Sequence, residues 1–114
     1  MITNSKLTIY HKELDDNKIE TYKRVNYDKV WAFINTKVQR DNGINNDNSI
    51  EIRIPYKKNK LNVSDFSLGD YVIPEYVDKD IKSITELKNY RVFQIISIKD
   101  NNFGTEPHIH LGGE

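Results

Sequence analysis

Two histidines and a glutamate near the C-terminal end are the residues of this chain best suited to chemistry. His108 and His110 stand two positions apart in the segment Pro107-His108-Ile109-His110-Leu111, and Glu114 follows. Side chains alternate along a strand, so both imidazoles are expected on one face. Neutral imidazole and carboxylate groups bind divalent metals. The alternative, which we favour, is a pair of exposed or interface histidines on a terminal strand.

The spacing His-x-His-x-x-x-Glu resembles the first metal motif of cupins over seven residues. In cupins the motif lies early in a barrel, and a further histidine comes from a later strand. Here His11 is the only other histidine, and it precedes the motif. A small cupin-like metal enzyme built on His108, His110 and Glu114 is therefore kept as an alternative, and we expect no metal and no cofactor.

Other catalytic patterns do not emerge from the sequence. Cysteine is absent, which excludes a thiolate nucleophile and a thiolate zinc site. Neither a nucleophile elbow nor a glycine-rich phosphate loop occurs. Neighbouring acidic residues such as Asp15 and Asp16 stand in turn-like contexts. We therefore expect a protein that is not an enzyme.

Length and charge limit the remaining classes. The chain has 114 residues, enough for one domain with a modest core, and we predict a single domain over 1–114. Lysine plus arginine and aspartate plus glutamate both number 17, so no global charge attracts nucleic acid or an anionic membrane. The sequence has neither a long apolar run nor the apolar core of a signal peptide. We expect a protein made in a cytoplasm, with no membrane partner.

Alternating apolar residues predict a mainly β fold. Ile50, Ile52 and Ile54 alternate with charged residues, which is typical of a strand buried on one side. Read as a strand, the segment 28–38 places Trp31 and Phe33 on one face. Ser83 and Glu86 have capping-box spacing and predict a short helix near 84–89. We predict a small β-barrel or sandwich of about six to seven short strands, drawn from the segments 6–11, 18–23, 28–38, 50–56, 70–77, 91–100 and 107–111, with 112–114 frayed.

The segment 39–48 is polar and offers almost nothing to bury. It is longer than a tight hairpin requires, so we predict a projecting loop there. A solvated connection without a role and a functional loop are both compatible with this composition. The residues at its centre are Arg40, Asp41, Asn42, Gly43, Ile44, Asn45 and Asn46.

Tyrosine is frequent, with seven residues in the chain. A barrel this small cannot bury all of them, and tyrosine is favoured in protein interfaces. The candidate interface residues are Tyr56, Tyr71, Tyr76 and Tyr90. A different interpretation is a barrel resembling an oligonucleotide-binding fold, in which aromatic rings stack on bases and Lys57, Lys58 and Lys60 form a basic rim.

Several short motifs in a fixed order resemble small head-completion proteins of tailed phages that infect low-GC Gram-positive bacteria. The resemblance extends from about Tyr27 onward. It rests on the Trp31 strand, the polar loop, Ile52-Arg53-Ile54-Pro55, Gly69-Asp70-Tyr71-Val72, the segment from Ile84 to Leu87, the strand from Phe93 to Asp100 with Asn101, and Pro107-His108.

This resemblance implies a structural virion protein. Stopper-type proteins are small β-barrels that form a homo-oligomeric ring below the portal and its adaptor, close the DNA channel and dock the tail. The loop 39–48 matches the position that reaches toward the channel axis. The implied partners are portal or adaptor proteins, tail terminator or tail proteins, and packaged DNA near the channel. The implied location is the head-tail junction of the virion, assembled in the host bacterial cytoplasm, and a tail terminator ring protein is the alternative within this class.

Overall fold

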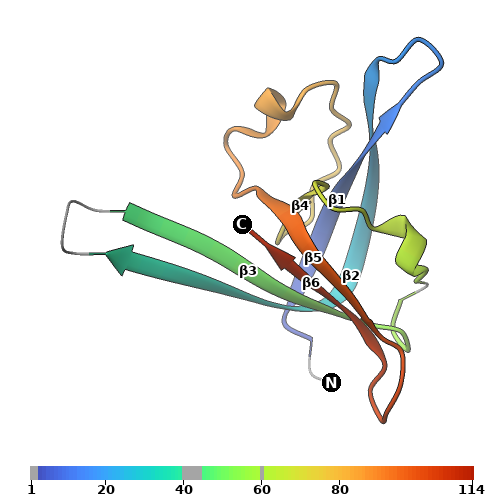
Figure 1. Cartoon of the computed structure of the whole chain (residues 1–114), viewed down its shortest axis with the longest axis vertical. Helices are drawn as coiled ribbons and strands as arrows, with labels where there is room; N and C mark the ends of the chain where they lie inside the picture. Colours follow the sequence, from blue (N-terminus) through green and yellow to red (C-terminus); the bar gives the residue numbers. More distant parts are fainter. Residues whose placement is uncertain (1–2, 40–44, 60) are drawn as a thin grey trace.

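The computed structural model describes residues 3–39, 45–59 and 61–114, and for 36–39 and 45–48 it describes the backbone alone. Six strands within these ranges form one closed barrel in the order β1-β2-β3-β6-β5-β4 (Figure 1). All neighbouring strands are antiparallel, which confirms the predicted mainly β fold. The strands are β1 (Ser5–Leu14), β2 (Glu20–Gln39), β3 (Asn45–Pro55), β4 (Tyr71–Ile73), β5 (Phe93–Asn101) and β6 (His108–Gly113).

Strand β2 replaces the two strands predicted over 18–23 and 28–38. Its first part, up to Val30, pairs with β1, and from Trp31 onward it pairs with β3. No glycine or proline interrupts the residues between the two predicted segments. Where the partner changes, the Asn4 side chain accepts from the Ala32 backbone N–H at 2.9 Å and donates to the Ala32 carbonyl at 3.1 Å. The side-chain amide thus extends the β1–β2 ladder by one step.

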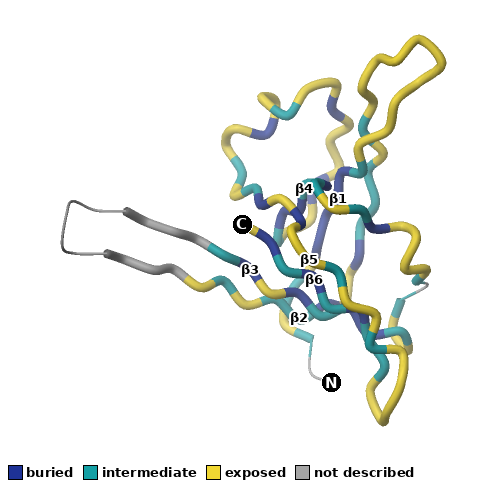
Figure 2. Tube along the Cα trace, in the orientation of Figure 1, coloured by how far each residue is buried: buried dark blue, intermediate teal, exposed yellow. Residues whose placement is uncertain are grey.

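The main core fills the barrel interior. The alternating isoleucines Ile50, Ile52 and Ile54 are fully buried, as their pattern predicted, and the buried parts of the strands converge on the barrel (Figure 2). Burying such a side chain contributes roughly 1.5–3 kcal/mol. Their partners in this core include Leu7, Ile9, Val30, Val72, Phe93, Ile95, Ile109 and Leu111.

A second core lies beneath the connection 74–92 between β4 and β5. It contains Tyr10 from β1, Ile73 from β4, and Val77, Ile81 and Leu87 from the connection. The strand predicted over 70–77 is shorter than expected: β4 ends at Ile73, and the chain then leaves the sheet to cover the second core. Strand β4 is not at a sheet edge, since it hydrogen-bonds both β1 and β5.

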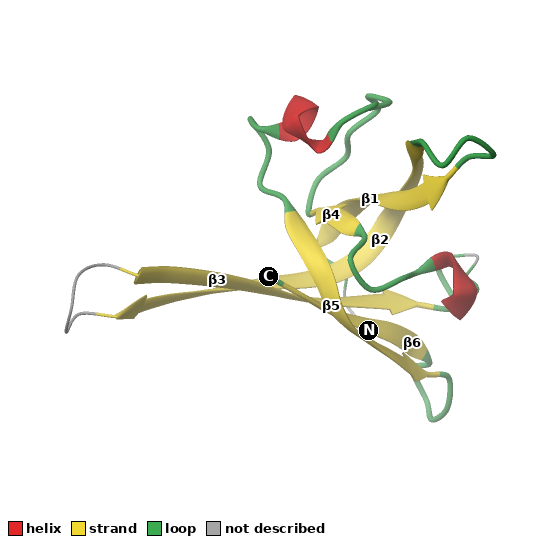
Figure 3. Ribbon diagram, turned by 45° about the horizontal axis from the view of Figure 1, so that its top comes forward, coloured by secondary structure: helices red, strands yellow, loops and turns green. Residues whose placement is uncertain are grey.

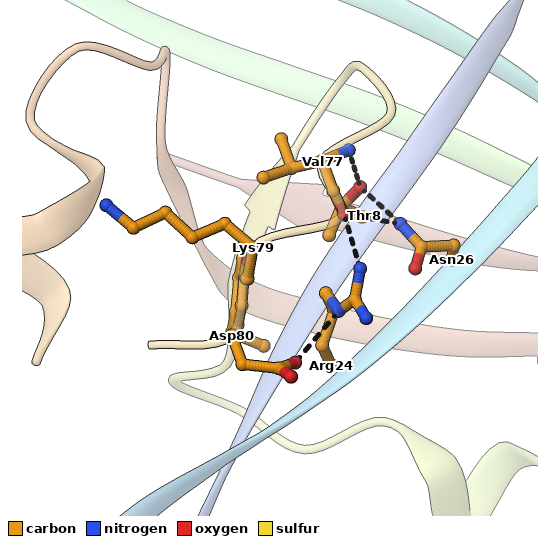
Figure 4. Close-up of polar contacts among 7 residues, drawn as sticks. Thr8, Arg24, Asn26, Val77, Lys79 and Asp80 are labelled. Carbon is orange, nitrogen blue, oxygen red and sulfur yellow. Dashed lines mark hydrogen bonds and ion pairs between the residues drawn. The ribbon is translucent and has the colours of Figure 1, made fainter. Parts of the chain in front are cut away.

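A buried threonine holds this connection on the barrel. The Thr8 hydroxyl donates to the Glu75 carbonyl at 2.8 Å and accepts from the Asn26 side chain at 2.8 Å and from the Val77 backbone N–H at 2.9 Å. Around it, Asn26 and Arg24 both donate to the Val77 carbonyl, and Arg24 Nε lies 3.1 Å from Asp80 Oδ1 (Figure 4). Every hydrogen-bonding capacity of the buried hydroxyl is used.

The helical content of the described residues is two short 3₁₀ turns, η1 (Val63–Asp65) and η2 (Ile84–Leu87), drawn as coils in Figure 3. The predicted capping box is present, because Glu86 Oε2 accepts from the Ser83 backbone N–H at 3.1 Å. The helix expected over 84–89 is shorter than predicted and is 3₁₀ in type, and η1 was not predicted. No helix within residues 3–39, 45–59 and 61–114 combines the length and apolar character needed to span a bilayer.

The C-terminal residues belong to the barrel, so the expected fraying over 112–114 is wrong. Gly113 pairs with Ile50 on β3 and with Ile95 on β5. Glu114 exchanges both backbone hydrogen bonds with Gln94, at 3.0 and 2.9 Å. Because Gly112 and Gly113 have no side chain, β3, β5 and β6 can approach each other closely. In the sequence, two glycines near the C-terminal end had indicated a frayed segment.

The Gly113→Ala substitution is expected to lower the free energy of unfolding by about 2 kcal/mol through overpacking. A Cβ on Gly113 would lie 2.9 Å from Ile50 Cγ2 and 3.1 Å from the Gln94 carbonyl oxygen. The matched control is Gly112→Ala, whose Cβ would meet the Ser97 hydroxyl, an exposed group that can rotate away. Urea denaturation of the three proteins measures the difference. Equal stability of the two variants would contradict the assigned packing.

Candidate functional site: a hairpin arm and the sheet face at its root

Strands β2 and β3 continue together beyond the barrel. The last β3 residue paired with β6 on this side is Ile50, opposite Gly113. Further pairs between β2 and β3 run from Asn35 opposite Ser49 to Gln39 opposite Asn45. At about 3.4 Å per residue, these pairs extend roughly 17 Å from the barrel. We call the paired residues 35–39 and 45–49 the hairpin arm, and Figure 1 shows these two strand ends leaving the barrel on their own.

The predicted loop over 39–48 is shorter than expected. Gln39 and residues 45–48 form strand, because the backbone pairing of β2 with β3 continues in register to Gln39 and Asn45. Among the predicted channel-facing residues, Asn45 and Asn46 therefore lie in β3. The others, Arg40, Asp41, Asn42, Gly43 and Ile44, lie outside the described residues.

The arm's composition gives it no core. Val38 is the only apolar residue in the two strands of the arm, 35–39 and 45–49. An isolated two-stranded ribbon is marginally stable in water. A surface supplied by another molecule would add apolar contacts to a ribbon whose two strands contain a single apolar residue.

The outer sheet face at the root of the arm carries two aromatic rings. Trp31 of β2 is opposite Arg53 of β3, which is opposite His110 of β6 and, beyond it, Lys99 of β5. Paired residues share a face, so these four side chains form one row. Phe33, two residues after Trp31, is 53% exposed. We call Trp31, Phe33, Arg53, His110 and Lys99 the aromatic face.

Stacking organises this face. The Trp31 and Phe33 rings are stacked, with centroids 6.3 Å apart and planes 11° from parallel. The Arg53 guanidinium lies 4.8 Å from the Trp31 ring centroid, a cation–π arrangement. Alternation in the sequence placed the two rings on one side of a strand. It gave no sign that the arginine of the next strand would cover one of them and leave the other exposed.

The candidate metal residues do not form a ligand group. His108 and His110 share a face as predicted, with ring centroids 6.4 Å apart. However, His108 Nδ1 donates to the Glu106 carbonyl at 2.9 Å, and Nε2 accepts from Asn101 at 3.3 Å. The part of the chain that the structure describes contains no cluster of three or more histidine or acidic residues suited to a metal ion. The described residues therefore give the cupin-like alternative no support.

His110 is expected to make stability fall with acidification. Burial lowers its pKa below the usual value of 6.5, opposed in part by the Glu51 carboxylate, whose Oε1 lies 4.0 Å from Nε2. A lowered folded-state pKa means that the unfolded chain binds more protons, so stability is lost as pH falls below about 6.5. The His110→Gln variant should lose less stability than the wild type between about pH 7.5 and about pH 5. Urea denaturation along this range tests it, and parallel curves would contradict it.

His11 and Asp70 form the most buried ionisable pair described. His11 Nδ1 lies 2.8 Å from Asp70 Oδ2, and the buried carboxylate also accepts from the Ser67 backbone N–H at 3.0 Å. A carboxylate that orients a histidine is also part of hydrolase triads. Here His11 Nε2 faces Glu13 at 3.8 Å, and no hydroxyl among the described residues hydrogen-bonds to the ring. The pair joins β1 to the segment before β4.

The predicted interface tyrosines have different surroundings. Tyr71 and Tyr90 are half-buried against the second core. Tyr56 donates to Asp100 Oδ1 at 2.7 Å, and desolvation together with this hydrogen bond raises its pKa to about 12. Tyr76 is 53% exposed, with the Lys6 ammonium 5.8 Å from its ring centroid. The interface role of these residues stays a prediction.

The predicted basic rim is also only partly described. Lys57 and Lys58 are exposed just after β3, whereas Lys60 lies outside the described residues. An oligonucleotide-binding barrel stays an alternative interpretation. In it, the rings of the aromatic face would be the ones that stack on bases.

Comparison with known proteins yields a family. No curated protein and no solved structure matches this chain. The model of DUF6751, a family of unknown function, matches residues 2–114, and the chain therefore belongs to that family.

Proposed function

We propose that this chain is a structural virion protein of the stopper type, which forms a ring at the head-tail junction of a tailed phage. The observation that carries the proposal is the hairpin arm, a ribbon that leaves a closed barrel between β2 and β3. The sequence resemblance to head-completion proteins assigns the channel-facing loop to this part of the chain. A projecting arm on a compact barrel is the shape that such a role requires.

Two further features support a structural role. Two of the three histidines are hydrogen-bonded to other groups of the chain: His108 to Glu106 and Asn101, and His11 to Asp70. The equal numbers of acidic and basic residues favour contact with protein neighbours over tight binding of DNA. In this proposal the barrels pack side by side around the channel, and the arms extend from them to meet neighbouring chains and the DNA path.

The proposal is tested by removing the chain from the phage that encodes it. Particles assembled without a stopper should package DNA and then lose it, and tails of normal length should accumulate separately. Electron microscopy and DNA quantification of purified heads measure both effects. Abnormally long tails would instead indicate the tail terminator alternative. Normal infectious particles without this chain would overturn the proposal.

Location provides a second test. Antibody labelling of intact particles should place the chain at the junction between head and tail, and mass spectrometry should find it in purified virions. Its absence from virions would contradict a structural role even if assembly requires it.

A further inference from the structure

The hairpin that joins β1 to β2 ends in exposed apolar side chains. Leu14 and Ile19 are 65% and 59% exposed. Their turn is well ordered, because Asp15 Oδ1 accepts from the backbone N–H groups of Asn17 and Ile19 at 2.9 and 2.8 Å. We call residues 13–20 the hairpin tip. In Figure 2 the tip is exposed throughout, so the chain itself covers neither apolar residue.

The charges of the hairpin tip and the aromatic face are complementary. The tip has one ammonium group, Lys18, and four carboxylates, Glu13, Asp15, Asp16 and Glu20, of which Glu20 is ion-paired with Lys12 at 2.9 Å. The aromatic face contains the cations Arg53 and Lys99, and its acidic neighbour is Glu51, which is directly opposite Phe33. The hairpin tip is therefore acidic and apolar, whereas the aromatic face is basic and aromatic, and the two surfaces are complementary in charge.

Arg53 is incompletely satisfied within the chain. Its Nε is buried and has no hydrogen-bond acceptor among the described residues. No carboxylate in that part of the chain forms an ion pair with it either, although the guanidinium stacks on Trp31. A guanidinium held over an aromatic ring and lacking a carboxylate is a favourable partner for an acidic group from another molecule.

We propose that the hairpin tip of one copy docks on the aromatic face of the next copy. Leu14 and Ile19 would then cover Phe33, and a tip carboxylate would reach Arg53. The tip and the arm root lie on different sides of the barrel in two views (Figures 1 and 3). Two different patches on one chain make a heterologous contact, which generates a ring when the rotation closes. This inference rests on the ring of the proposed function and names its interface.

A second copy fits these surfaces better than a nucleic acid. A single strand could stack on Trp31 and Phe33 and meet Arg53 and Lys99. It would leave the acidic, apolar tip without a partner. A copy of the chain satisfies both surfaces at once.

The decisive experiment mixes two variants that each lack one surface. The tip variant carries Leu14→Asp and Ile19→Asp, and the face variant carries Phe33→Asp. Light scattering after size-exclusion chromatography should show concentration-dependent association of the wild type and monomers for each variant alone. An equimolar mixture should form one-to-one dimers and nothing larger, because one intact tip meets one intact face.

A matched control separates this contact from general loss of surface apolarity. Phe103 lies between β5 and β6, outside both surfaces, and is 77% exposed. The Phe103→Asp variant should associate as the wild type does. Because all substituted side chains are exposed, thermal melting should show that every variant keeps the wild-type fold.

Cross-linking provides a direct readout, since the chain has no cysteine. A Leu14→Cys variant mixed with a Phe33→Cys variant should give disulfide-linked dimers on oxidation, and neither should do so alone. If both Asp variants associate like the wild type, the ring uses another interface and the proposed function stands. If neither the mixture nor the wild type associates, the interface is overturned. Binding of a labelled single-stranded oligonucleotide that Phe33→Asp abolishes would assign the face to nucleic acid instead.

Discussion

Replacement of residues 36–48 by Asn-Gly should leave a stable barrel that no longer supports infectious particles. The new turn would join Asn35 to Ser49, which already face each other across β2 and β3. Asn-Gly favours the two-residue turn that matches strand twist. The two strands of the arm, 35–39 and 45–49, contain one apolar residue, Val38, so the melting temperature should stay near that of the wild type. Complementation of a phage lacking the chain should fall to the background of the empty vector.

A graded variant controls for the deletion itself. An Asn-Gly turn between Lys37 and Asp47, which are also paired, keeps part of the arm. If the length of the arm determines its function, this variant should complement less well than the wild type and better than the protein in which residues 36–48 are replaced. Full infectivity of the replaced-arm protein would remove the main support for the stopper proposal, whereas loss of folding would show that the arm stabilises the barrel.

The Thr8→Val substitution should lower the free energy of unfolding by about 3 kcal/mol, the second large effect. Valine is close in shape to threonine, but it leaves the Val77 backbone N–H and the Glu75 carbonyl without their partner. An unsatisfied buried group costs about 1–3 kcal/mol. For a domain of this size the melting temperature should fall by roughly 10 °C.

Thr8→Ser is the matched control, because it keeps the hydroxyl and removes a methyl group. It should be clearly more stable than Thr8→Val in urea denaturation. Amide exchange should also become faster across 75–81 in the valine variant, since these residues lose their attachment to β1. If the valine and serine variants are equally stable, the hydroxyl is not what holds the connection 74–92 on the barrel.

These two predictions separate folding from function along the chain. The network around Thr8 holds the connection 74–92 on the barrel and includes no residue of the arm. The arm is expected to be dispensable for folding and essential for assembly. A chain with both properties behaves as a rigid body that carries a binding element.

The sequence indicated the strands wherever local alternation matched burial. Ile50, Ile52 and Ile54 were predicted on a buried face and are fully buried. The capping box at Ser83 and Glu86 was also predicted, because it depends on residues close together in the chain. The mainly β fold could be predicted because the sequence has no long stripe of apolar residues at helical spacing. Each of these features is set by neighbours within a few residues.

The sequence by itself therefore determined the fold class, the main core face and the position of the arm. Only the tertiary structure decided that Thr8 and Tyr10, on the face opposite Leu7 and Ile9, are buried as well, because residues 74–92 cover them. Closure of the barrel likewise made Gly113 a central position. Such contacts join segments far apart in the chain, and a side-chain pattern reports the two faces of a strand but not what comes to lie on them.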